Sequence, residues 1–271
     1  MELPLAELEI DAYLISVPTP TVLGRVDLSC VRDAASAVGR ALWHHPAWPV
    51  VAVRSTVPPG TTEEVVIPIL EDVSGRVGGR DFGVCVNPEF LRARSADADF
   101  MAPRVIVIGA LDARSEIALR RLYSWWTDVP VIATSLRTAE ATKYVANLFN
   151  ATKISFFNEM HEVLTRLGAD PDLAARAVSL GAEGMWNPAY GTQGRAPFAG
   201  ACLPKDTLGF LGVLEEEGLA SLAPIIRAVV EVNDRVARTA RPLELDLKLP
   251  PAPSTSDVVV VPDKHEASVR T

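Results

Sequence analysis

Short apolar runs alternate with helix-patterned segments through the first half of the chain, and this alternation limits the folds open to it. Five runs rich in β-branched residues have the length of strands: residues 11–17, 50–55, 82–87, 104–109 and 129–134. Segments 27–43, 61–73 and 112–126 have the apolar spacing of helices. The alternation predicts an α/β fold with a mostly parallel, doubly wound, Rossmann-like sheet. Because the runs are almost wholly apolar, we expect both faces of the sheet to be covered.

One long helix is predicted where the strand pattern stops. Residues 138–168 keep a helical pattern, with Thr138 as the expected N-cap, Glu140 in the first turn and Gly168 at the C′ position. A helix of this length spans about 45 Å. Helices this long connect domains or line a dimer interface, so we expect one of these roles.

The rest of the chain is predicted to be helical and then to lose its pattern. Asp170 and Pro171 open a second helix that ends at Gly181. Residues 181–201 are rich in Gly and Pro and predict a long loop of the kind that often carries function. Further helices are expected at 205–217 and 223–240. Clustered prolines in residues 241–271 predict a disordered tail.

Composition excludes several classes of protein. The net charge is −8 over 271 residues, without the basic stripe of a nucleic-acid binder. No apolar run reaches the roughly 18 residues needed to cross a bilayer, and no basic segment precedes the first apolar run. We therefore expect a cytoplasmic protein with no membrane and no nucleic acid as partner. Three widely spaced cysteines, Cys30, Cys85 and Cys202, indicate neither a disulfide framework nor a metal site.

Five short segments, in this order, are similar to those of one enzyme family. They are SVPTPT (16–21), STVPPGTT (55–62), NPEFLR (87–92), KYVAN (143–147) and CLPKD (202–206). Together they resemble the UDP-glucose/GDP-mannose dehydrogenase family over residues 10–240. The resemblance implies a partial dinucleotide-binding domain at 1–135 and a helical central domain at 136–240 that dimerises through the helix at 138–168. It also implies NAD as cofactor and a nucleotide sugar, of the UDP-glucose or GDP-mannose type, as substrate.

The activity implied by the resemblance is a four-electron oxidation of the sugar C6 alcohol to a carboxylate, through a thioester on Cys202. Cys202 follows a glycine-containing loop and precedes a helix, where backbone N–H groups and the helix dipole favour a thiolate. The plainer interpretation of any cytosolic cysteine is a buried, inert thiol. We expect that state for Cys30, on an apolar helix face, and for Cys85, in a strand.

Lys143 and Asn147 are four residues apart on one helix, so they share a side and could stabilise an oxyanion. The alternative for this pair is a solvated polar stripe. By resemblance, Glu89 helps water attack the thioester, and Thr56 and Asp206 orient that water. Turn chemistry and helix capping are the plainer roles for Thr56 and Asp206.

The remaining site residues are assigned by resemblance alone. The expected NAD contacts are Thr21, Thr56 and Lys205. The expected substrate pocket consists of Glu89, Phe90, Leu91, Arg92, Lys143, Asn147, Phe198 and Gly200.

The sequence also departs from the family pattern. The family's second carboxylate is replaced by Ala93, and its glycine pair before the nucleophile is Ala199-Gly200. No GxGxxG turn precedes Asp11, and the glycine-rich stretch at 75–80 is expected to be a loop. The family's C-terminal domain is not recognisable beyond residue 240.

The sequence leaves three hypotheses open: a dehydrogenase whose missing parts lie elsewhere, a non-catalytic remnant, or a relative that performs a single β-hydroxyacid oxidation. The third reaction does not require the cysteine. The three hypotheses predict two, no and one NADH per sugar, respectively.

Overall fold

The computed structural model describes residues 11–239 except 93, 193 and 195. The expected disordered tail at 241–271 and the departure at Ala93 therefore lie outside the described residues. The chain divides into two compact units, Met1–Phe156 and Phe157–Thr271. Each unit is described by itself, and the domain boundary expected near residue 135 remains a prediction.

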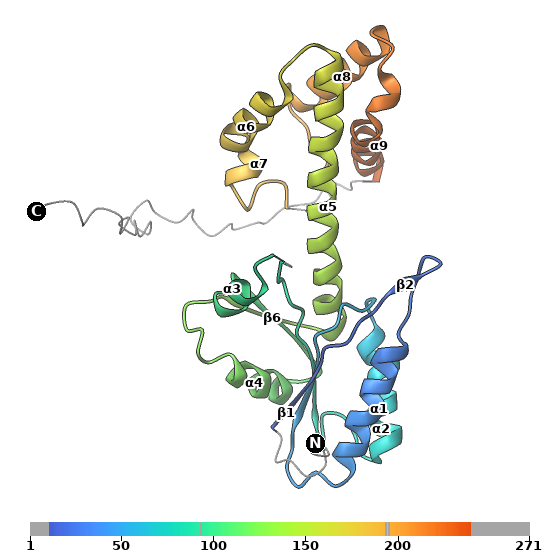
Figure 1. The fold of residues 1–271 in the computed structure, drawn as a ribbon, viewed down its shortest axis with the longest axis vertical. Helices are drawn as coiled ribbons and strands as arrows, with labels where there is room; N and C mark the ends of the chain where they lie inside the picture. Colours follow the sequence, from blue (N-terminus) through green and yellow to red (C-terminus); the bar gives the residue numbers. More distant parts are fainter. Residues whose placement is uncertain (1–10, 93, 193, 195, 240–271) are drawn as a thin grey trace, which may run out of the picture. The chain divides into compact units, whose positions relative to one another are not determined.

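The first unit is built on a five-stranded sheet with the order β1-β4-β5-β6-β7. Its strands are β1 Ala12–Ile15, β4 Val50–Val53, β5 Gly83–Val86, β6 Ile106–Ala110 and β7 Val131–Thr134. Four of the five predicted runs contain one of these strands, and the run at 104–109 overlaps β6, which ends one residue later at Ala110, so the α/β fold class is confirmed. Helices α1 Ser29–Trp43 and α2 Ile67–Ser74 cover one face, and α4 Ala113–Leu122 covers the other (Figure 1).

Every residue of β4 and β5 is buried, as the apolar runs predict. Alternate residues of β4 belong to two core clusters. Val51 and Val53 face the cluster beneath α1 and α2, whereas Val50 and Ala52 face the cluster beneath α4. This arrangement follows from the two-residue period of a strand covered on both sides.

One pair of neighbouring strands is antiparallel. β1, β4 and β5 are mutually parallel, and so are β6 and β7, but β6 runs against β5. In the described part of the connection at 87–105, the six-residue α3 Ala96–Met101 is the one helix. Parallel neighbours need a crossover back to the other end of the sheet. Because β6 is antiparallel, the chain leaves β5 and enters β6 at the same edge of the sheet.

A small hairpin that the sequence analysis did not predict follows β1. Strands β2 Thr21–Val22 and β3 Arg25–Val26 pair through a two-residue turn. Leu23 and Gly24 both have positive φ, +50° and +77°. Such turns suit the twist of a hairpin, but glycine or asparagine normally occupies both positions. Because Leu23 occupies the first of these positions, the sequence lacks the residue pair that normally predicts such a turn.

The helix expected at 61–73 begins with wider turns than predicted. Residues Thr62–Val66 form a π-helical turn, η2, and α2 starts only at Ile67. Pro68 has no N–H to donate to the carbonyl of residue 64, and its ring crowds that carbonyl. Widening the turn ahead of the proline relieves this crowding, as π-bulges do in other helices.

The long helix α5 runs Leu136–Arg166, close to the prediction. Its N-terminal cap is Ser135 rather than Thr138, because the Ser135 hydroxyl accepts the Thr138 N–H at 3.2 Å. The C-terminal prediction is confirmed. Gly168 has a φ of +75°, and the N–H of Ala169 donates to the Leu164 carbonyl at 2.9 Å, which closes the end of the helix.

The second unit packs helices around a small core. It contains α6 Pro171–Gly181, α7 Glu183–Trp186, α8 Leu203–Glu216, the 3₁₀ turn η3 Ala220–Leu222 and α9 Pro224–Thr239. The Asp170 carboxylate caps α6 as expected, by accepting the N–H groups of Asp172 and Leu173. The loop expected at 181–201 contains the short helix α7. Val163, Leu214 and Ala223 are the buried centre of this unit.

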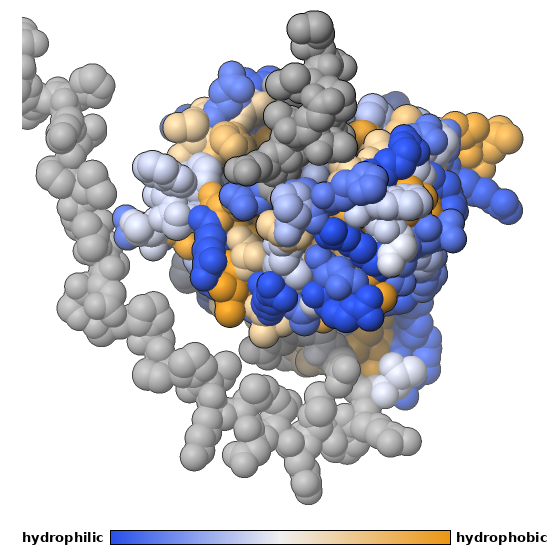
Figure 2. Space-filling model, turned by 90° about the horizontal axis from the view of Figure 1, so that it is seen from below, coloured by the Kyte–Doolittle hydropathy of each residue, from blue (hydrophilic) through white to orange (hydrophobic). Residues whose placement is uncertain are grey.

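The surface of the described residues carries both hydrophilic and hydrophobic side chains. Viewed from below in Figure 2, most residues are hydrophilic and the hydrophobic ones form separate patches, as on most folded proteins. Within residues 11–239, no helix has both the length and the apolarity that a bilayer crossing requires.

Candidate active site

Two of the recognised segments meet beside the ends of β1 and β4. Ser55 Oγ accepts the N–H of Val17 at 2.7 Å, and Thr19 Oγ1 donates to the carbonyl of Thr56 at 2.7 Å. Thr56 is half-buried, while Thr21 is exposed in β2. Ligands of open α/β sheets bind at this carboxyl edge of the strands.

The central feature of the site is an ion pair between Glu89 and Lys143. Glu89 follows β5, and its Oε1 lies 3.0 Å from Lys143 Nζ on α5. The Lys143 side chain is only 9% exposed, whereas that of Glu89 is 30% exposed. The other Glu89 oxygen accepts the backbone N–H of Leu91 at 2.5 Å. A buried ammonium thus has one carboxylate partner, and that carboxylate is still reachable from solvent.

Of the other residues of the predicted pocket, Phe90 contacts this pair. The Phe90 ring lies with its centroid 5.7 Å from Lys143 Nζ, within the range of a cation–π contact. Asn147 lies one turn along α5 from Lys143 and is exposed. Arg92 is held by Asp99, with Nη2 2.6 Å from Oδ1. The Arg92 guanidinium also holds the pKa of Asp99 well below its usual range, so this exposed pair stays charged.

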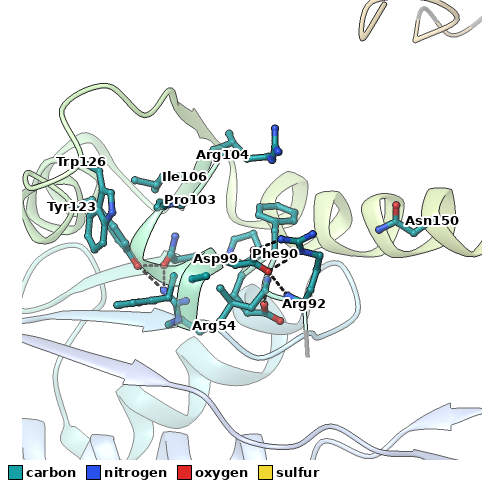
Figure 3. Close-up of a pocket in the computed structure, with 18 residues that line it drawn as sticks. Arg54, Phe90, Arg92, Asp99, Pro103, Arg104, Ile106, Tyr123, Trp126 and Asn150 are labelled. Carbon is teal, nitrogen blue, oxygen red and sulfur yellow. Dashed lines mark hydrogen bonds and ion pairs between the residues drawn. The ribbon is translucent and has the colours of Figure 1, made fainter. Parts of the chain in front are cut away.

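A cavity of about 490 Å³ opens beside Glu89. Its wall combines aromatic rings with arginine and asparagine side chains (Figure 3). The labelled members are Arg54, Phe90, Arg92, Asp99, Pro103, Arg104, Ile106, Tyr123, Trp126 and Asn150. The volume falls within the range of small-molecule sites. The cavity is formed by Arg54 after β4, the connection between β5 and β6 with the first residue of β6, the residues at the end of α4, and Asn150 of α5.

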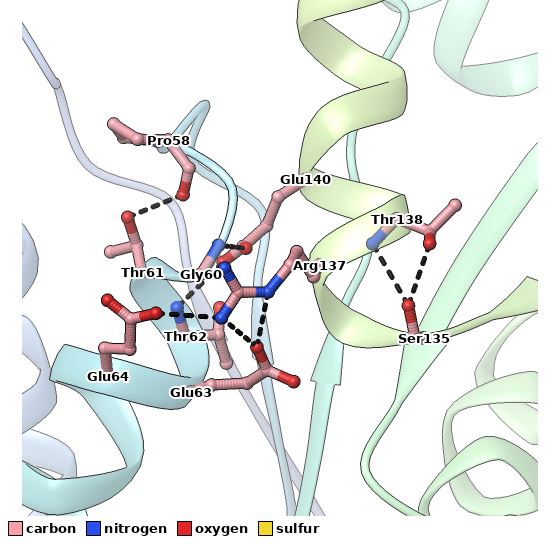
Figure 4. A network of polar contacts seen from close by, with 10 residues as sticks. All are labelled: Pro58, Gly60, Thr61, Thr62, Glu63, Glu64, Ser135, Arg137, Thr138 and Glu140. Atoms are coloured by element: carbon pink, nitrogen blue, oxygen red, sulfur yellow. Dashed lines mark hydrogen bonds and ion pairs between the residues drawn. The ribbon is translucent and has the colours of Figure 1, made fainter.

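The residues present fit only part of a dinucleotide. Thr56 offers a hydroxyl at the carboxyl edge of the sheet, where the nicotinamide half of NAD could lie. The backbone N–H groups at the start of η2, next to Gly60, are not free to bind a pyrophosphate. The Glu140 carboxylate already accepts the N–H groups of Gly60 and Thr62 there, at 2.5 and 2.8 Å (Figure 4). Within the described residues we therefore assign no site to the pyrophosphate.

The second unit carries the remaining predicted residues. Cys202 is exposed and stands at the N-cap of α8, as the sequence predicts, with Lys205 and Asp206 in the first turn as an exposed ion pair. Phe198 is held through its backbone by the Asn233 side chain, which accepts its N–H at 2.7 Å and donates to its carbonyl at 3.2 Å. Gly200 has a φ of +89°, a conformation that suits glycine.

The other two cysteines differ from each other. Cys85 is buried as expected, and burial raises the pKa of its thiol to about 12, which makes it unreactive at neutral pH. The expectation for Cys30 was wrong, because this residue is exposed. Cys30 is the second residue of α1, and it lies off the buried face that contains Val31, Ala35 and Val38.

The structure thus brings together Glu89, Phe90, Leu91 and Lys143 in the first unit, and Cys202, Lys205 and Asp206 in the second. Of the residues that line the cavity, the sequence analysis assigned only Glu89, Phe90, Leu91 and Arg92 to a site. Those it did not assign include Arg54, Asn87 and Tyr123. One signal was present, since Asn87 and Arg54 are polar residues placed directly after fully apolar strands. Nothing in the sequence pattern marks Tyr123.

Comparison with known proteins gives the same family along most of the chain. Residues 2–127 match the NAD-binding domain of the UDP-glucose/GDP-mannose dehydrogenase family, and residues 137–235 match its central domain. The cofactor expected from the sequence agrees with the name of the first domain.

Individual relatives agree with this assignment. GDP-mannose 6-dehydrogenase of Azotobacter vinelandii is 39% identical over 202 residues, which cover 74% of this chain and 46% of the relative. UDP-glucose 6-dehydrogenase of Haloferax volcanii is 33% identical and is covered to 53%. The chain therefore spans about half the length of the curated relatives it matches.

A solved structure also matches the fold. The ternary complex of GDP-mannose dehydrogenase from Pseudomonas aeruginosa superposes with a TM-score of 0.77 at 32% identity, covering 84% of this chain and 52% of that one. The UDP-glucose dehydrogenase of Pyrobaculum islandicum gives 0.60 at 41% identity. The chain belongs to the UDP-glucose/GDP-mannose dehydrogenase family.

Proposed function

We propose that this chain carries the catalytic core of a nucleotide-sugar 6-dehydrogenase, which oxidises the C6 alcohol of a UDP-glucose- or GDP-mannose-type substrate to a carboxylate. The observation that carries the proposal is the Glu89–Lys143 ion pair at the carboxyl edge of the sheet, beside a cavity of small-molecule size. The names of the relatives, which act on GDP-mannose or UDP-glucose, support the substrate class.

The proposed chemistry gives each residue a distinct task. Loss of a hydride and a proton converts the alcohol to an aldehyde. The Cys202 thiolate adds to the aldehyde carbon, and the resulting oxyanion is stabilised by the Lys143 ammonium and the Asn147 amide. Loss of a second hydride leaves a thioester on Cys202.

Water then attacks the thioester carbon, and the bond to sulfur breaks to release the carboxylate and regenerate the thiol. Glu89 takes the proton of this water as a general base, and Asp206 and Thr56 orient it. Thr56 would hold the nicotinamide half of NAD at the carboxyl edge of the sheet, and the cofactor would supply the hydride acceptor for both oxidations, which corresponds to two NADH per sugar.

Product analysis tests the proposal directly. The chain is incubated with NAD and either UDP-glucose or GDP-mannose, and uronic acid and NADH are quantified. We expect two NADH per uronic acid, and we expect Cys202→Ser to lower acid formation by about three orders of magnitude, as loss of a catalytic nucleophile does. Cys30→Ser is the matched control, because Cys30 is also an exposed thiol.

Other outcomes identify the competing readings. One NADH per sugar that does not depend on Cys202 indicates a single β-hydroxyacid-type oxidation. Binding or folding without NADH indicates a non-catalytic remnant. Acid formation that Cys202→Ser leaves unchanged contradicts the assignment of the nucleophile.

We further propose that the chain forms a homodimer through α5. The apolar face of Val145, Leu148 and Phe149 supports this, since each side chain is more than 60% exposed in the described chain. A second copy that covers this face would form a two-fold interface. The cytoplasm remains the expected location of the proposed reaction.

A further inference from the structure

Three polar side chains form a closed network at the base of the cavity. Arg54 Nη1 donates to Asn87 Oδ1 at 2.5 Å and to the Tyr123 hydroxyl at 2.6 Å. The Tyr123 hydroxyl in turn donates to Asn87 Oδ1 (Figure 3). Arg54 follows β4, Asn87 follows β5 and Tyr123 caps the end of α4. One guanidinium thus ties together three elements that are distant in sequence.

The network fixes the Asn87 side chain in one orientation. Its Oδ1 faces two donors, and its Nδ2 donates to the carbonyl of Val107 at 2.8 Å. The opposite orientation would set the amide N–H groups against the Arg54 donor and the amide oxygen against a carbonyl. Asn87 is only 2% exposed, so no water-exposed alternative is open to it.

Asn87 is two residues from the carboxylate of the proposed active site. Pro88 lies between them, and its ring restricts the backbone of that link. Glu89 follows, with one oxygen on Lys143 and the other on the N–H of Leu91. The place of the Glu89 carboxylate therefore depends on where Asn87 is held.

The charge of Arg54 has no carboxylate partner in the described part of the chain. The guanidinium is half-buried. A cation with only neutral partners loses hydration without a compensating charge. This cost points to a role for Arg54 in the cavity that it lines.

We propose that Arg54 is a positioning residue of the active site. It fixes Asn87, and through Asn87 and Pro88 it places the Glu89 carboxylate against Lys143. The inference deepens the proposed function, because it concerns the same ion pair. The placement of Glu89 can nevertheless be measured without any turnover.

The test measures how readily the Lys143 amine is acylated. The full chain is treated with a limiting amount of acetic anhydride, and labelling of Lys143 is read by peptide mass spectrometry relative to Lys153, an exposed lysine on the same helix. In Arg54→Met, Asn87 is no longer held in place, so the Glu89 carboxylate shifts away from Lys143. The Lys143 amine then loses its ion-pair partner and reacts more readily. We expect Lys143 labelling to rise on the order of tenfold, as the loss of a hydrogen bond to a charged group allows. Arg54→Lys, which keeps one donor and the charge, should restore part of the protection.

The matched control is Arg120→Met, which removes an arginine of α4 that pairs with Glu116 and does not line the cavity. It should leave Lys143 labelling unchanged.

Circular dichroism establishes that each variant is folded under the labelling conditions. If Arg54→Met does not fold, Tyr123→Phe decides by the same ratio, since it removes a single oxygen from the network. Unchanged labelling in the folded Arg54 or Tyr123 variant, or an equal rise in Arg120→Met, overturns the proposal. Failure to detect uronic acid would count against the proposed function and leave this result standing.

Discussion

Glu140 is a buried glutamate in the first turns of α5. It is 2% exposed, and its two oxygens accept the N–H groups of Gly60 and Thr62 (Figure 4). Burial raises the pKa of the Glu140 carboxyl above its ordinary value of 4.5, although these hydrogen bonds oppose the shift. Gly60 suits this contact, because its φ is +99° and a Cβ there would lie 2.8 Å from the Arg137 side chain.

The raised pKa of Glu140 predicts a dependence of stability on pH. The folded chain holds this proton more tightly than the unfolded chain, so the contribution to stability is fully present below pH 4.5 and is lost as the pH rises through the folded pKa. Glu140→Gln removes this titration. In urea unfolding across this pH window, we expect the stability of the variant relative to the natural chain to increase with pH.

Two comparisons check the cause. Glu140→Ala leaves two buried N–H groups without an acceptor and should lower the free energy of unfolding by about 2 kcal/mol at neutral pH. Glu64→Gln alters an exposed carboxylate near the same helix start and should leave the pH slope unchanged. An identical slope in Glu140→Gln and the natural chain would contradict the prediction.

At the scale of the element, a second buried glutamate of α5 also accepts two backbone N–H groups at the start of another helix. Glu159 is 8% exposed, and its carboxylate accepts the N–H groups of Ile225 and Ile226 at 2.7 and 3.1 Å. These N–H groups lie in the first turn of α9, which has no intrahelical acceptors for them. A carboxylate there also interacts favourably with the helix dipole.

We expect Glu159→Gln to loosen the start of α9. An amide can accept from only one of the two N–H groups at that position, so the other is left unpaired, and the negative charge is lost as well. The free energy of unfolding should fall by about 1–2 kcal/mol. Hydrogen–deuterium exchange should accelerate at Ile225 and Ile226 before the rest of α9. Glu162→Gln, an exposed glutamate on the same helix, is the control and should change neither measurement.

The elements that were predictable from sequence are those whose signal is local. Strands such as β4 and β5 are continuous apolar runs, and Gly168 marks a helix end by its own conformational preference. The direction of β6 was not predictable, because it depends on where the connection at 87–105 travels. The same holds for the site. The recognised motifs supply Glu89 and Lys143, whereas the network of Arg54 depends on three elements meeting in space.

At the scale of the whole molecule, the surface of α5 bears on assembly. Val145, Leu148 and Phe149 have the i, i+3, i+4 spacing of one helix face, and Ile154, also 63% exposed, lies on the opposite side. Val163, near the other end of α5, belongs to the core of the second unit. Val145, Leu148 and Phe149 all lie in the first unit, whose own described residues leave this face exposed.

We expect a second copy of the chain to bind to this face of α5. Mutation of Phe149, the aromatic residue of the face, tests this expectation. Light scattering after size exclusion should give a particle of about twice 29.1 kDa for the natural chain. Phe149→Asp places a charge at the centre of the proposed interface, where desolvation of an unpaired carboxylate is costly, and should give monomers. Leu173→Asp on α6 is the matched control, because Leu173 is 64% exposed and Phe149 is 63% exposed. The control should remain dimeric. A stable monomer of the natural chain at micromolar concentration would exclude the dimer and leave the proposed chemistry at Glu89, Lys143 and Cys202 to be judged by its own product analysis.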